Sequence, residues 1–423
     1  MNIAVSITEG RTVRDLFYNG LLDNLLENGF DSVTIFTEAV RVPEFIREWK
    51  RPEVEFASLL PCDITSWRQR AFWMRRRLVR LHSRVLLQAW IKWEERRLYP
   101  PRQSYLDAFK QRPPALLLTT HAHLFREAEL ISAAHHLGIP TLGVVRSWDN
   151  VHKGIRSRPR RLAVWNQVNQ QEVIELEGYL PNEVDVIGSP QFDPYFAPDT
   201  IWSREKFAAH FQIDPARPIL LFATLGNFFP ELDETCWMDV LLGLIDQGAI
   251  PGSPQVICRL HPWSRLEQFQ KYAAHPDVRL SYVERYVPSL QWYMTRADVV
   301  LMANMLEHAA IVITPGSTVT LEAAIFDRPT LVPIFHPYQP ERAKSYFSTW
   351  VLGKHFGRIE SLDLAPIIRR VEDFPVALRR CLLEPSWYRE KRAQLVRDYV
   401  TFTDGSSVKR LGELARRTAL KRV

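Results

Sequence analysis

The chain has 423 residues, more than one hydrophobic core usually organises, so we expect two domains of about 200 residues each. Hydrophobic residues make up 46% and charged residues 24% of the chain, a composition that excludes an intrinsically disordered protein. The net charge of +6 is local, because residues 67–97 hold ten Lys or Arg and two Glu and therefore carry +8.

The first residues and the cysteines indicate the compartment. "MNIAVSITEG" has neither a basic n-region nor a long apolar stretch, so we expect no secretory signal. No window approaches about 18 uninterrupted apolar residues, so we expect no membrane-spanning helix. The cysteines form no CxxC pair, which suits a reducing compartment and a cytosolic protein. They are Cys62, Cys236, Cys258 and Cys381.

The first half of the chain predicts alternating strands and helices. Residues 2–7 read as a strand, residues 12–29 as a helix that ends at a glycine, and residues 31–37 as a second strand. This βαβ opening favours a parallel sheet. Beyond the basic segment, further strands are predicted at 114–120, 139–145, 160–166 and 184–189, with helices at 123–138 and 167–178.

The stretch "PQFDPYFAPDT", residues 190–200, carries three prolines and no periodicity, so we place a domain boundary there. The predicted domains are residues 1–195 and 196–423. The alternation then restarts, and the expected fold class is α/β with two doubly wound, Rossmann-like units. In the second half, strands are predicted at 218–226, 255–262, 277–283, 310–316 and 329–335.

The turn "ITPGST" follows an apolar strand, where open α/β sheets bind their ligands. Gly316 makes the turn, and either Ser317 or Thr318 is placed to cap the next helix. The amino end of that helix would offer N–H groups to a phosphate. Glu322 lies one turn further on, where its carboxylate could accept hydrogen bonds from a ribose. A turn that only caps a helix fits the same residues.

Two other strand ends carry candidate ligand contacts. Arg259 and His261, in "RLHP", lie at the sheet edge where the turn is expected, so both could reach a phosphate. Gly226 and Asn227 end the first strand of the second half, where a glycine lets backbone approach a ligand closely. A structural histidine and an ordinary turn glycine are the alternatives.

The order of these motifs resembles that of a known fold. "GNFF", "RLHPW", "ADVVL", "ITPGSTVTLEAAIFDRPTLVPIF" and "TDGSSVKRL" together resemble the donor-binding half of GT-B glycosyltransferases, over about residues 200–410. The resemblance is closest to the branch with UDP-N-acetylglucosamine 2-epimerases, CDP-glycerol glycerophosphotransferases and capsule-polysaccharide transferases. It implies two Rossmann-like domains that face across a cleft, with the acceptor on the first and the nucleotide-sugar donor on the second.

The resemblance also implies roles for particular residues. In that branch the Gly-Ser-Thr turn receives the donor pyrophosphate, which corresponds to Ser317 and Thr318, and the helical glutamate holds the ribose, which corresponds to Glu322. A His-Pro at the position of His261 helps to bind the nucleotide phosphate in related transferases. The 2-epimerases carry a His-Arg-Glu-Asn run where this chain reads "TLGNFFPEL", so an epimerase is less favoured.

Sugar transfer also needs a base that deprotonates the acceptor hydroxyl. We expect it on a strand-end loop of the first half, and rank Asp149, Glu9 and His121 as candidates. Asp149 stands first because its loop, "VVRSWDNVHKG", places a tryptophan where a plain turn needs none. Each candidate also fits a helix cap or a salt bridge. No Asp-x-Asp signature or His/Asp ligand cluster appears, so we predict a reaction without a metal.

The basic segment, residues 67–97, predicts an amphipathic helix. Its apolar residues recur at three- and four-residue spacing with arginines between them, a pattern that fits the surface of an anionic membrane. The alternatives are a solvated arginine face and apolar residues that pack in the core. No nucleic-acid-binding module accompanies the charge. The apolar positions are Trp67, Ala71, Met74, Leu78, Leu81 and Val85.

The sequence therefore predicts a cytosolic glycosyltransferase that moves a sugar from a UDP or CDP/CMP type donor to a cell-surface glycan or lipid-linked acceptor, with no cofactor. Peripheral association with the inner face of the plasma membrane stays open. Two alternatives also stay open. One is a UDP-sugar 2-epimerase or a CDP-glycerol-type transferase, and the other is a non-catalytic protein that binds a nucleotide or glycan.

Overall fold

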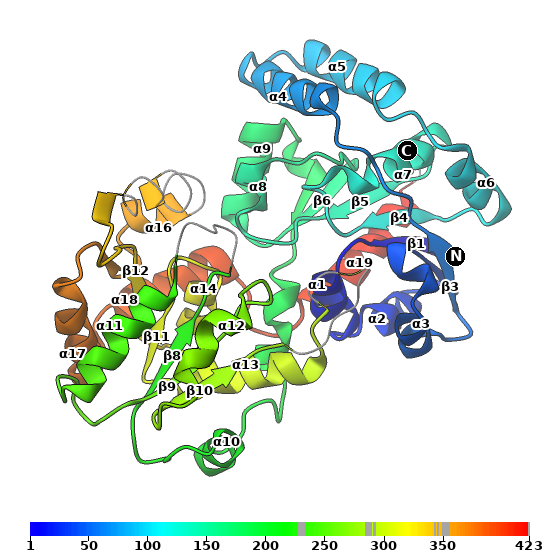
Figure 1. Ribbon diagram of the computed structural model, residues 1–423. Coiled ribbons are helices and arrows are strands. Elements are labelled where there is room, and N and C mark those ends of the chain that lie inside the picture. The colour runs from blue at the N-terminus through cyan, green and yellow to red at the C-terminus, as the bar shows by residue number, and fades with distance from the viewer. Residues whose placement is uncertain are drawn as a thin grey trace. The chain divides into compact units, whose positions relative to one another are not determined.

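The computed structural model describes residues 1–226, 233–283, 290, 293–341, 344, 347–348 and 356–421 (Figure 1). Asn227 lies outside these residues. The chain forms two compact units. Unit 1 comprises Met1–Asp193, Tyr286–Met294 and Tyr399–Val423, and unit 2 comprises Pro194–Arg285 and Thr295–Asp398.

Unit 1 is built on a seven-stranded parallel sheet in the order β3-β2-β1-β4-β5-β6-β7. Its central strands are buried throughout because helices cover both faces, which explains why "LLLT" is apolar without alternation. The strands are β1 Asn2–Ile7, β2 Ser32–Thr37, β3 Val54–Ser58, β4 Leu116–Thr119, β5 Thr141–Val144, β6 Arg161–Val164 and β7 Val184–Val186.

The strand order of unit 1 reverses between β1 and β4. The chain runs outward from β1 to β3, and then returns to place β4 beside β1, with Ile3 opposite Leu116. Neighbouring strands whose connections leave in opposite directions open a crevice at their carboxyl ends, where such folds bind ligands. The loops after β1 and β4 are therefore the favoured place for a site in this unit.

The elements of unit 1 differ in part from the predicted ones. The helix expected over residues 12–29 is broken at Gly20, which has a φ of 82° and precedes α2. The strand β3 and the helices α3, α6 and α8 were not predicted. The helices are α1 Gly10–Thr12, the π-turn η1 Val13–Phe17, α2 Leu21–Glu27, α3 Pro43–Trp49, α4 Ser66–Arg80, α5 Arg84–Arg97, α6 Gln103–Gln111, α7 Ala128–His136, α8 Asn150–Lys153, α9 Gln167–Glu177 and α19 Ser407–Leu420, with short 3-10 turns η2 Glu38–Arg41, η3 Phe125–Glu127 and η4 Pro181–Glu183.

The C-terminal helix corrects the predicted domain boundaries. α19 packs against α2, and its Leu411 and Leu414 are buried in the core of unit 1. Asp193 accepts hydrogen bonds from the backbone N–H groups of Ser407 and Val408, at 3.0 and 2.9 Å, and so caps the start of α19. The "TDGSSVKRL" stretch therefore belongs to unit 1, although the sequence assigned it to the donor-binding half.

Unit 2 is built on a six-stranded parallel sheet in the order β10-β9-β8-β11-β12-β13. β8 and β9, "ILLFA" and "QVICR", are buried at every position. The order reverses between β8 and β11, so the loops after these strands occupy the second favoured ligand position. The strands are β8 Ile219–Ala223, β9 Gln255–Arg259, β10 Val278–Ser281, β11 Ile311–Ile313, β12 Thr330–Pro333 and β13 Ile367–Ile368.

The helices of unit 2 alternate with its strands as far as β12, as a doubly wound fold requires. α13 begins with a capping box in which Thr295 and Asp298 bond each other's backbone N–H groups. The two parallel, doubly wound sheets confirm the predicted α/β class. The helices are α10 Arg204–Phe211, α11 Thr235–Asp246, α12 Leu266–Phe269, α13 Arg296–His308, α14 Val319–Ile325, α16 Gly357–Ser361, α17 Asp373–Leu383 and α18 Arg389–Leu395, with 3-10 turns η5 Pro190–Phe196 and η6 Gln270–Tyr272 and the π-turn η8 Val396–Val400.

Residues 67–97 form two antiparallel helices, α4 and α5, instead of the single helix expected (Figure 1). The chain turns at His82, which has a φ of 51°, and the Ser83 side chain accepts a hydrogen bond from Leu86 N and caps α5. The reading that Trp67, Met74 and Leu81 pack in the core is wrong, because their side chains are exposed. Of the helices that the structure describes, none combines the length and hydropathy needed to cross a bilayer.

Candidate active site

The three predicted base candidates follow three adjacent strands of unit 1. Glu9 comes directly after β1, His121 after β4 and Asp149 after β5, so all three lie along the carboxyl edge of the sheet. The structure brings Glu9 and His121 together at the reversal point, where Glu9 Oε1 lies 3.6 Å from His121 Nδ1. Asp149 lies one strand further along the same edge.

His121 is fully buried, and its two ring nitrogens have different surroundings. Its Nδ1 lies 3.1 Å from Thr8 Oγ1 and near Glu9, whereas its Nε2 has no hydrogen-bond partner among the residues that the structure describes. Burial, reinforced by Arg146 and Arg11, lowers the pKa of His121 well below its usual value. The ring is therefore neutral near pH 7, and a proton on Nδ1 leaves Nε2 as a proton acceptor.

Glu127, which the sequence did not single out, fixes this loop pair. Its carboxylate accepts hydrogen bonds from Ser6 Oγ and from the backbone N–H groups of Thr120 and His121, the latter two at 2.9 and 3.1 Å. Because the side chain is fully buried, its pKa rises to about 7 despite these bonds. Glu127 thus ties the end of β1 to the end of β4 and sets the position of His121.

A pocket opens at the same edge, with unpaired polar atoms in its wall. Within the described residues, Thr12 Oγ1, Asp15 Oδ2, Arg146 Nε and Trp165 Nε1 are buried without a hydrogen-bond partner. Buried polar atoms without partners are costly, and a polar ligand would satisfy them. The pocket is lined by Thr12, Asp15, Leu16, Thr120, Val144, Arg146, Trp165, Pro190 and Gln191.

Two arginines make this edge electropositive. The pKa of Arg11 falls to about 9 because of burial and the nearby charge of Arg146, although Arg11 also donates to Glu9 Oε2 at 2.7 Å. Arg146 forms no hydrogen bond or ion pair with any residue that the structure describes. An anionic group on a ligand would relieve the repulsion between the two guanidinium groups.

Asp149 is held in its own loop by local contacts. One carboxylate oxygen accepts from Ser147 Oγ at 2.6 Å, and the other pairs with the ammonium of Lys153. The adjacent Trp148 is buried, packs edge-on against Tyr399 and accepts from Asn169 Nδ2 through its carbonyl oxygen at 2.8 Å. These contacts explain the tryptophan in structural terms and make Asp149 a weaker base candidate than His121.

In unit 2, Gly226 and His261 lie together after β8 and β9. Gly226 has a φ of 88°, and a Cβ there would stand 2.6 Å from His261 Nδ1, so only glycine fits. His261 Nδ1 accepts a hydrogen bond from Trp263 N at 3.1 Å. The proton of the neutral ring therefore sits on Nε2, which makes that atom a donor suited to a phosphate oxygen.

Arg259 lies at the end of β9 and is buried, with an exposed fraction of 6%. Its Nη1 donates to Ser281 Oγ at 2.9 Å, whereas its Nη2, 3.9 Å from Asp298 Oδ1, has no hydrogen-bond partner among the described residues. Burial lowers its pKa below the usual range, and Asp298, Tyr195 and Glu322 act in the opposite direction. A buried guanidinium with an unused donor is well suited to bind an anion.

Glu322 is buried in α14 and accepts a hydrogen bond from the hydroxyl of Tyr195 at 2.5 Å. The sequence placed Glu322 where a ribose would bind, but it did not identify Tyr195, which lies far away in the chain. Tyr195 belongs to the proline-rich stretch that was interpreted only as a boundary. Tyr195 is thus a contact of Glu322 that the sequence analysis missed.

In the turn before α14, one of the two predicted capping residues forms the cap, but the first backbone N–H groups of the helix are not open. Ser317 provides the cap, because its hydroxyl accepts from Val319 N at 3.2 Å and its carbonyl accepts from Thr320 N at 3.0 Å. Thr318 stands at the cap position without a side-chain cap bond. The expectation that the first amides of this seven-residue helix are open is therefore wrong for Val319 and Thr320, which bond within the turn.

Two further residues at this edge escaped the sequence analysis. Glu234 is buried at the start of α11 and accepts from the backbone N–H groups of Leu225 and Gly226, at 2.6 and 3.0 Å; burial raises its pKa to about 8. His336, in a second His-Pro pair, follows β12, and its Nδ1 accepts from Tyr338 N at 3.2 Å. The repeated His-Pro after an apolar strand is the signal that could have identified His336.

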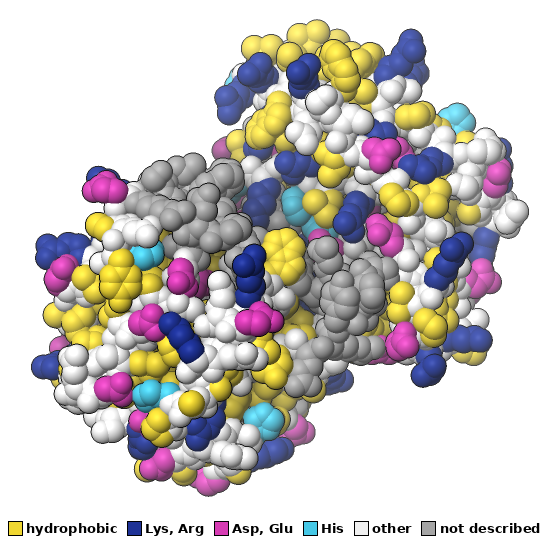
Figure 2. Space-filling view, in the orientation of Figure 1, with side chains coloured by type: hydrophobic (Ala, Val, Ile, Leu, Met, Phe, Trp, Pro, Cys, Tyr) yellow, Lys and Arg dark blue, Asp and Glu magenta, His cyan; other side chains and the backbone are white. Residues whose placement is uncertain are grey.

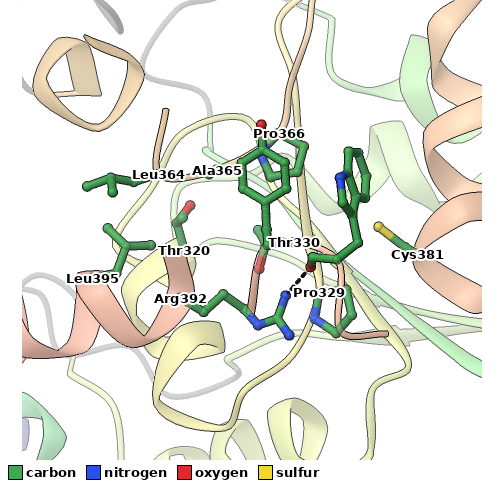
Figure 3. Close-up of a pocket in the computed structure, with 11 residues that line it drawn as sticks. Thr320, Pro329, Thr330, Leu364, Ala365, Pro366, Cys381, Arg392 and Leu395 are labelled. Atoms are coloured by element: carbon green, nitrogen blue, oxygen red, sulfur yellow. Dashed lines mark hydrogen bonds between the residues drawn. The ribbon is translucent and has the colours of Figure 1, made fainter. Parts of the chain in front are cut away.

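A second small pocket in unit 2 lies among α14, α17 and α18 (Figure 3). Its charged group, Arg392, is already bonded to the carboxylate of Asp327 and to the carbonyl oxygens of Trp387 and Pro385. The remaining wall is largely apolar, and Pro329 and Thr330 lie at the amino end of β12, away from the strand ends that carry the candidate residues. We interpret this pocket as a packing gap.

The side chains at the two edges do not form a recognisable metal centre. Within the described part of the chain, no group of three or more His, Cys, Asp or Glu side chains is placed to hold a metal ion. The reaction without a metal stays a prediction.

No known protein-family profile matches the sequence, and no curated protein matches it. Solved structures do match over the whole chain. The UDP-GlcNAc 2-epimerase of Neisseria meningitidis bound to UDP-GlcNAc superposes with a TM-score of 0.56 at 12% identity, covering 100% of both chains. The chain has the GT-B fold.

Other GT-B structures match equally well. S. aureus MnaA with UDP has a TM-score of 0.57 at 13% identity, covering 97% of this chain and 94% of that one. The wall teichoic acid polymerase TagF has a TM-score of 0.54 at 12% identity, covering 99% of this chain and 88% of that one. These neighbours are nucleotide-sugar enzymes and CDP-glycerol enzymes, and at such identities they establish the fold of the chain and leave its reaction open.

Proposed function

We propose that the protein is a glycosyltransferase that moves a sugar from a nucleotide-sugar donor to a glycan or lipid-linked acceptor. The observation that carries this proposal is that the points of strand-order reversal in the two sheets present different kinds of side chain. Unit 2 presents cationic and N–H donors at its strand ends, which suits a nucleotide diphosphate. Unit 1 presents a buried histidine beside a carboxylate, which suits proton abstraction.

The donor would bind at the β8/β11 edge of unit 2. Arg259 Nη2 and the N–H at His261 Nε2 would donate to the diphosphate, and Gly226 would let the backbone approach it. The turn at Gly316, Ser317 and Thr318 would contact the same group. Glu322, oriented by the Tyr195 hydroxyl, would accept hydrogen bonds from the ribose. The binding of UDP-GlcNAc and of UDP in two structures with the same fold supports this assignment.

The acceptor would bind in the pocket of unit 1, with Arg146 against an anionic group and its reacting hydroxyl beyond Thr120, the lining residue next to His121. His121 Nε2 would take the proton of the acceptor hydroxyl while Glu9 stabilises the ring through Nδ1. The acceptor oxygen then bonds to the anomeric carbon, and the bond from that carbon to the diphosphate oxygen breaks. The electron pair leaves with the nucleotide diphosphate, whose charge Arg259 and His261 would stabilise.

A UDP-sugar 2-epimerase is the second candidate, because several structural neighbours are such enzymes. A CDP-glycerol transferase is favoured by the likeness to TagF. The base Nε2 of His121 would serve either reaction, so the geometry alone does not separate them. What differs is the fate of the nucleotide.

The test is an assay of donor turnover with and without acceptor. A panel of UDP- and CDP-sugars is incubated with the protein, and free nucleotide and sugar configuration are followed by chromatography and NMR. A glycosyltransferase releases UDP or CDP in proportion to acceptor consumed, whereas an epimerase changes the sugar configuration of the donor alone. Release of CMP from CDP-glycerol would identify the glycerol phosphate transferase. Nucleotide binding without any turnover would indicate a non-catalytic protein and refute the proposal.

A further inference from the structure

The arginines of the α4–α5 hairpin, residues 66–97, fall into two structurally different groups. Three of them point inward and pair with carboxylates, two of which lie outside the hairpin and hold it on the rest of unit 1. Arg75 pairs with Glu94 at 2.5 Å, Arg76 with Glu177 at 3.4 Å and Arg68 with Glu129 at 2.7 Å. The orientation of the hairpin is therefore determined, because a buried or half-buried arginine must keep its partner.

The other seven cations of the hairpin are exposed. None of them forms an ion pair with any residue that the structure describes, and Arg70 only contacts the ring of Trp67. No carboxylate in this stretch is exposed, since Glu94 is buried and Glu95 is half-buried beside His135. The seven are Arg70, Arg77, Arg80, Arg84, Lys92, Arg96 and Arg97.

Large apolar side chains are exposed between these cations. On α4 the outward positions Trp67, Met74 and Leu81 recur every seven residues, so they share one face with Arg70 and Arg77. Figure 2 shows hydrophobic side chains (yellow) and Lys or Arg side chains (dark blue) side by side over the hairpin, at the top of the view. The exposed fractions are 67% for Trp67, 54% for Trp73, 39% for Met74, 64% for Leu81, 80% for Val85, 52% for Leu86 and 42% for Trp93.

We propose that the α4–α5 hairpin is a docking surface for an anionic lipid bilayer. Its cations would lie among the lipid phosphates, and Trp67, Trp73 and Trp93 would sit at headgroup depth, where tryptophan is favoured. Leu81, Val85 and the neighbouring apolar residues at the turn would enter the upper acyl region. The surface rests on its own contacts and does not depend on which reaction the protein catalyses.

Charge and chemistry favour a bilayer over other occupants. A patch that mixes seven unpaired cations with aliphatic residues needs a partner that is both anionic and apolar, and a bilayer with anionic lipids offers both in one plane. An RNA would pair with the cations and could stack on the tryptophans, but it has no apolar surface to bury the exposed side chains of Met74, Leu81, Val85 and Leu86. The two helices run antiparallel with only residues 81–83 between them, so both can lie on the bilayer together.

The test is co-sedimentation of the full-length protein with vesicles of phosphatidylcholine alone and with 30 mol% phosphatidylglycerol, a composition chosen as the probe. We expect binding to the anionic vesicles, at least 10-fold weaker binding to neutral ones, and a marked loss in high salt. Equal binding to both compositions, or no binding to either, would overturn the proposal.

Three variants separate the contributions of charge and apolar contact. Arg77→Glu with Arg84→Glu, and separately Leu81→Ser with Val85→Ser, should each weaken vesicle binding at least 10-fold. The control is Lys409→Glu with Arg416→Glu, which makes the same change of charge at exposed positions of α19 in the same unit and should bind as the wild type. All substituted side chains are exposed, and circular dichroism checks that the fold is kept.

A competition experiment distinguishes lipid from a soluble polyanion. If the Leu81→Ser, Val85→Ser variant binds vesicles as well as the wild type while polyuridylic acid displaces the protein from them, the hairpin is a polyanion site and the membrane proposal is wrong. If the apolar variant fails to bind and tryptophan fluorescence shifts to the blue only with anionic vesicles, the proposal is supported.

Discussion

The carboxyl edges of the two sheets share one structural device but carry different side chains. In each unit a buried glutamate, Glu127 or Glu234, accepts the backbone N–H groups of a loop beside the reversal point. Glu127 fixes the backbone of His121, whose Nε2 has no hydrogen-bond partner among the described residues. Glu234 fixes the backbone of Gly226, which lies against His261. The same device thus supports a proton acceptor in unit 1 and a close backbone approach in unit 2.

The two edges also differ in their charged groups and in the pKa values of these groups. In unit 1 burial, reinforced by the charges of Arg146 and Arg11, lowers the pKa of His121, which keeps its ring neutral. At the edge of unit 2 the buried guanidinium of Arg259 lies near Glu322 and Tyr195. If unit 1 performs proton transfer and unit 2 binds the nucleotide, substitutions in the two edges should affect different measurable quantities.

The largest effect is expected at His121. His121→Ala should lower turnover by about 100- to 10,000-fold, the range for loss of a general base, and leave the affinity for nucleotide nearly unchanged. His121→Gln, which keeps a neutral polar side chain, should be as inactive. Steady-state product release and calorimetric nucleotide binding measure the two quantities. Retention of turnover in both variants would remove His121 from the chemistry and favour Asp149 or Glu9.

The second effect concerns stability and pH. Since the pKa of Glu127 is about 7 in the fold and its ordinary value is 4.5, the unfolded chain loses this proton first as pH rises. The contribution of Glu127 to the free energy of unfolding is therefore complete below about pH 4.5. It falls by about 3 kcal/mol as the pH rises from about 4.5 to about 7. In Glu127→Gln, the free energy of unfolding, measured with urea, should depend less on pH between about 4.5 and 7. In Glu234→Gln it should depend less on pH between about 4.5 and 8. Unchanged pH dependence in both variants would contradict the burial argument.

The third effect is on nucleotide binding. Arg259→Ala should weaken nucleotide affinity by about 10- to 100-fold, because one charge-assisted hydrogen bond is lost from a buried site. Arg370→Ala removes an exposed arginine of the same unit and should bind nucleotide as the wild type does. Isothermal titration measures both. Equal losses in the two variants would mean that the effect is one of net charge only.

The smallest effect separates strain from contact. Gly226→Ala and Gly248→Ala both force an alanine into positive φ, at a cost of about 1 kcal/mol each. A Cβ at Gly248 meets nothing within 4 Å, whereas one at Gly226 meets His261, so Gly226→Ala should be less stable by about 1–2 kcal/mol more. Thermal unfolding measures the difference, and equal destabilisation would show that the His261 contact is easily relieved.

Much of the fold and part of the site were readable from sequence. Strands such as "ILLFA" are short apolar runs bounded by turn residues, and the ligand-facing loops follow them directly, so Gly226, His261 and Ser317 were found by position. Glu127 and Tyr195 were not, since their roles depend on which strands become neighbours and on contacts between distant segments. The sequence likewise does not show which sheet a C-terminal helix such as α19 covers, so its "SSVKRL" stretch was assigned to the wrong unit.

The hairpin illustrates a different limit. Ser83 and the positive φ at His82 break the basic segment into two helices. Serine is a common helix cap, but the regular spacing of the apolar residues favoured a single helix. Which arginines turn inward depended on three glutamates, two of them outside the hairpin.

The most direct test of the central claim is calorimetric titration of UDP, CDP, GDP and CMP into the wild type, His121→Ala and Arg259→Ala proteins. The account predicts that one nucleotide binds the wild type, that His121→Ala binds it with nearly the same affinity, and that Arg259→Ala binds it about 10- to 100-fold more weakly. Absence of binding by all four nucleotides, or loss of binding in His121→Ala with full binding in Arg259→Ala, would contradict it.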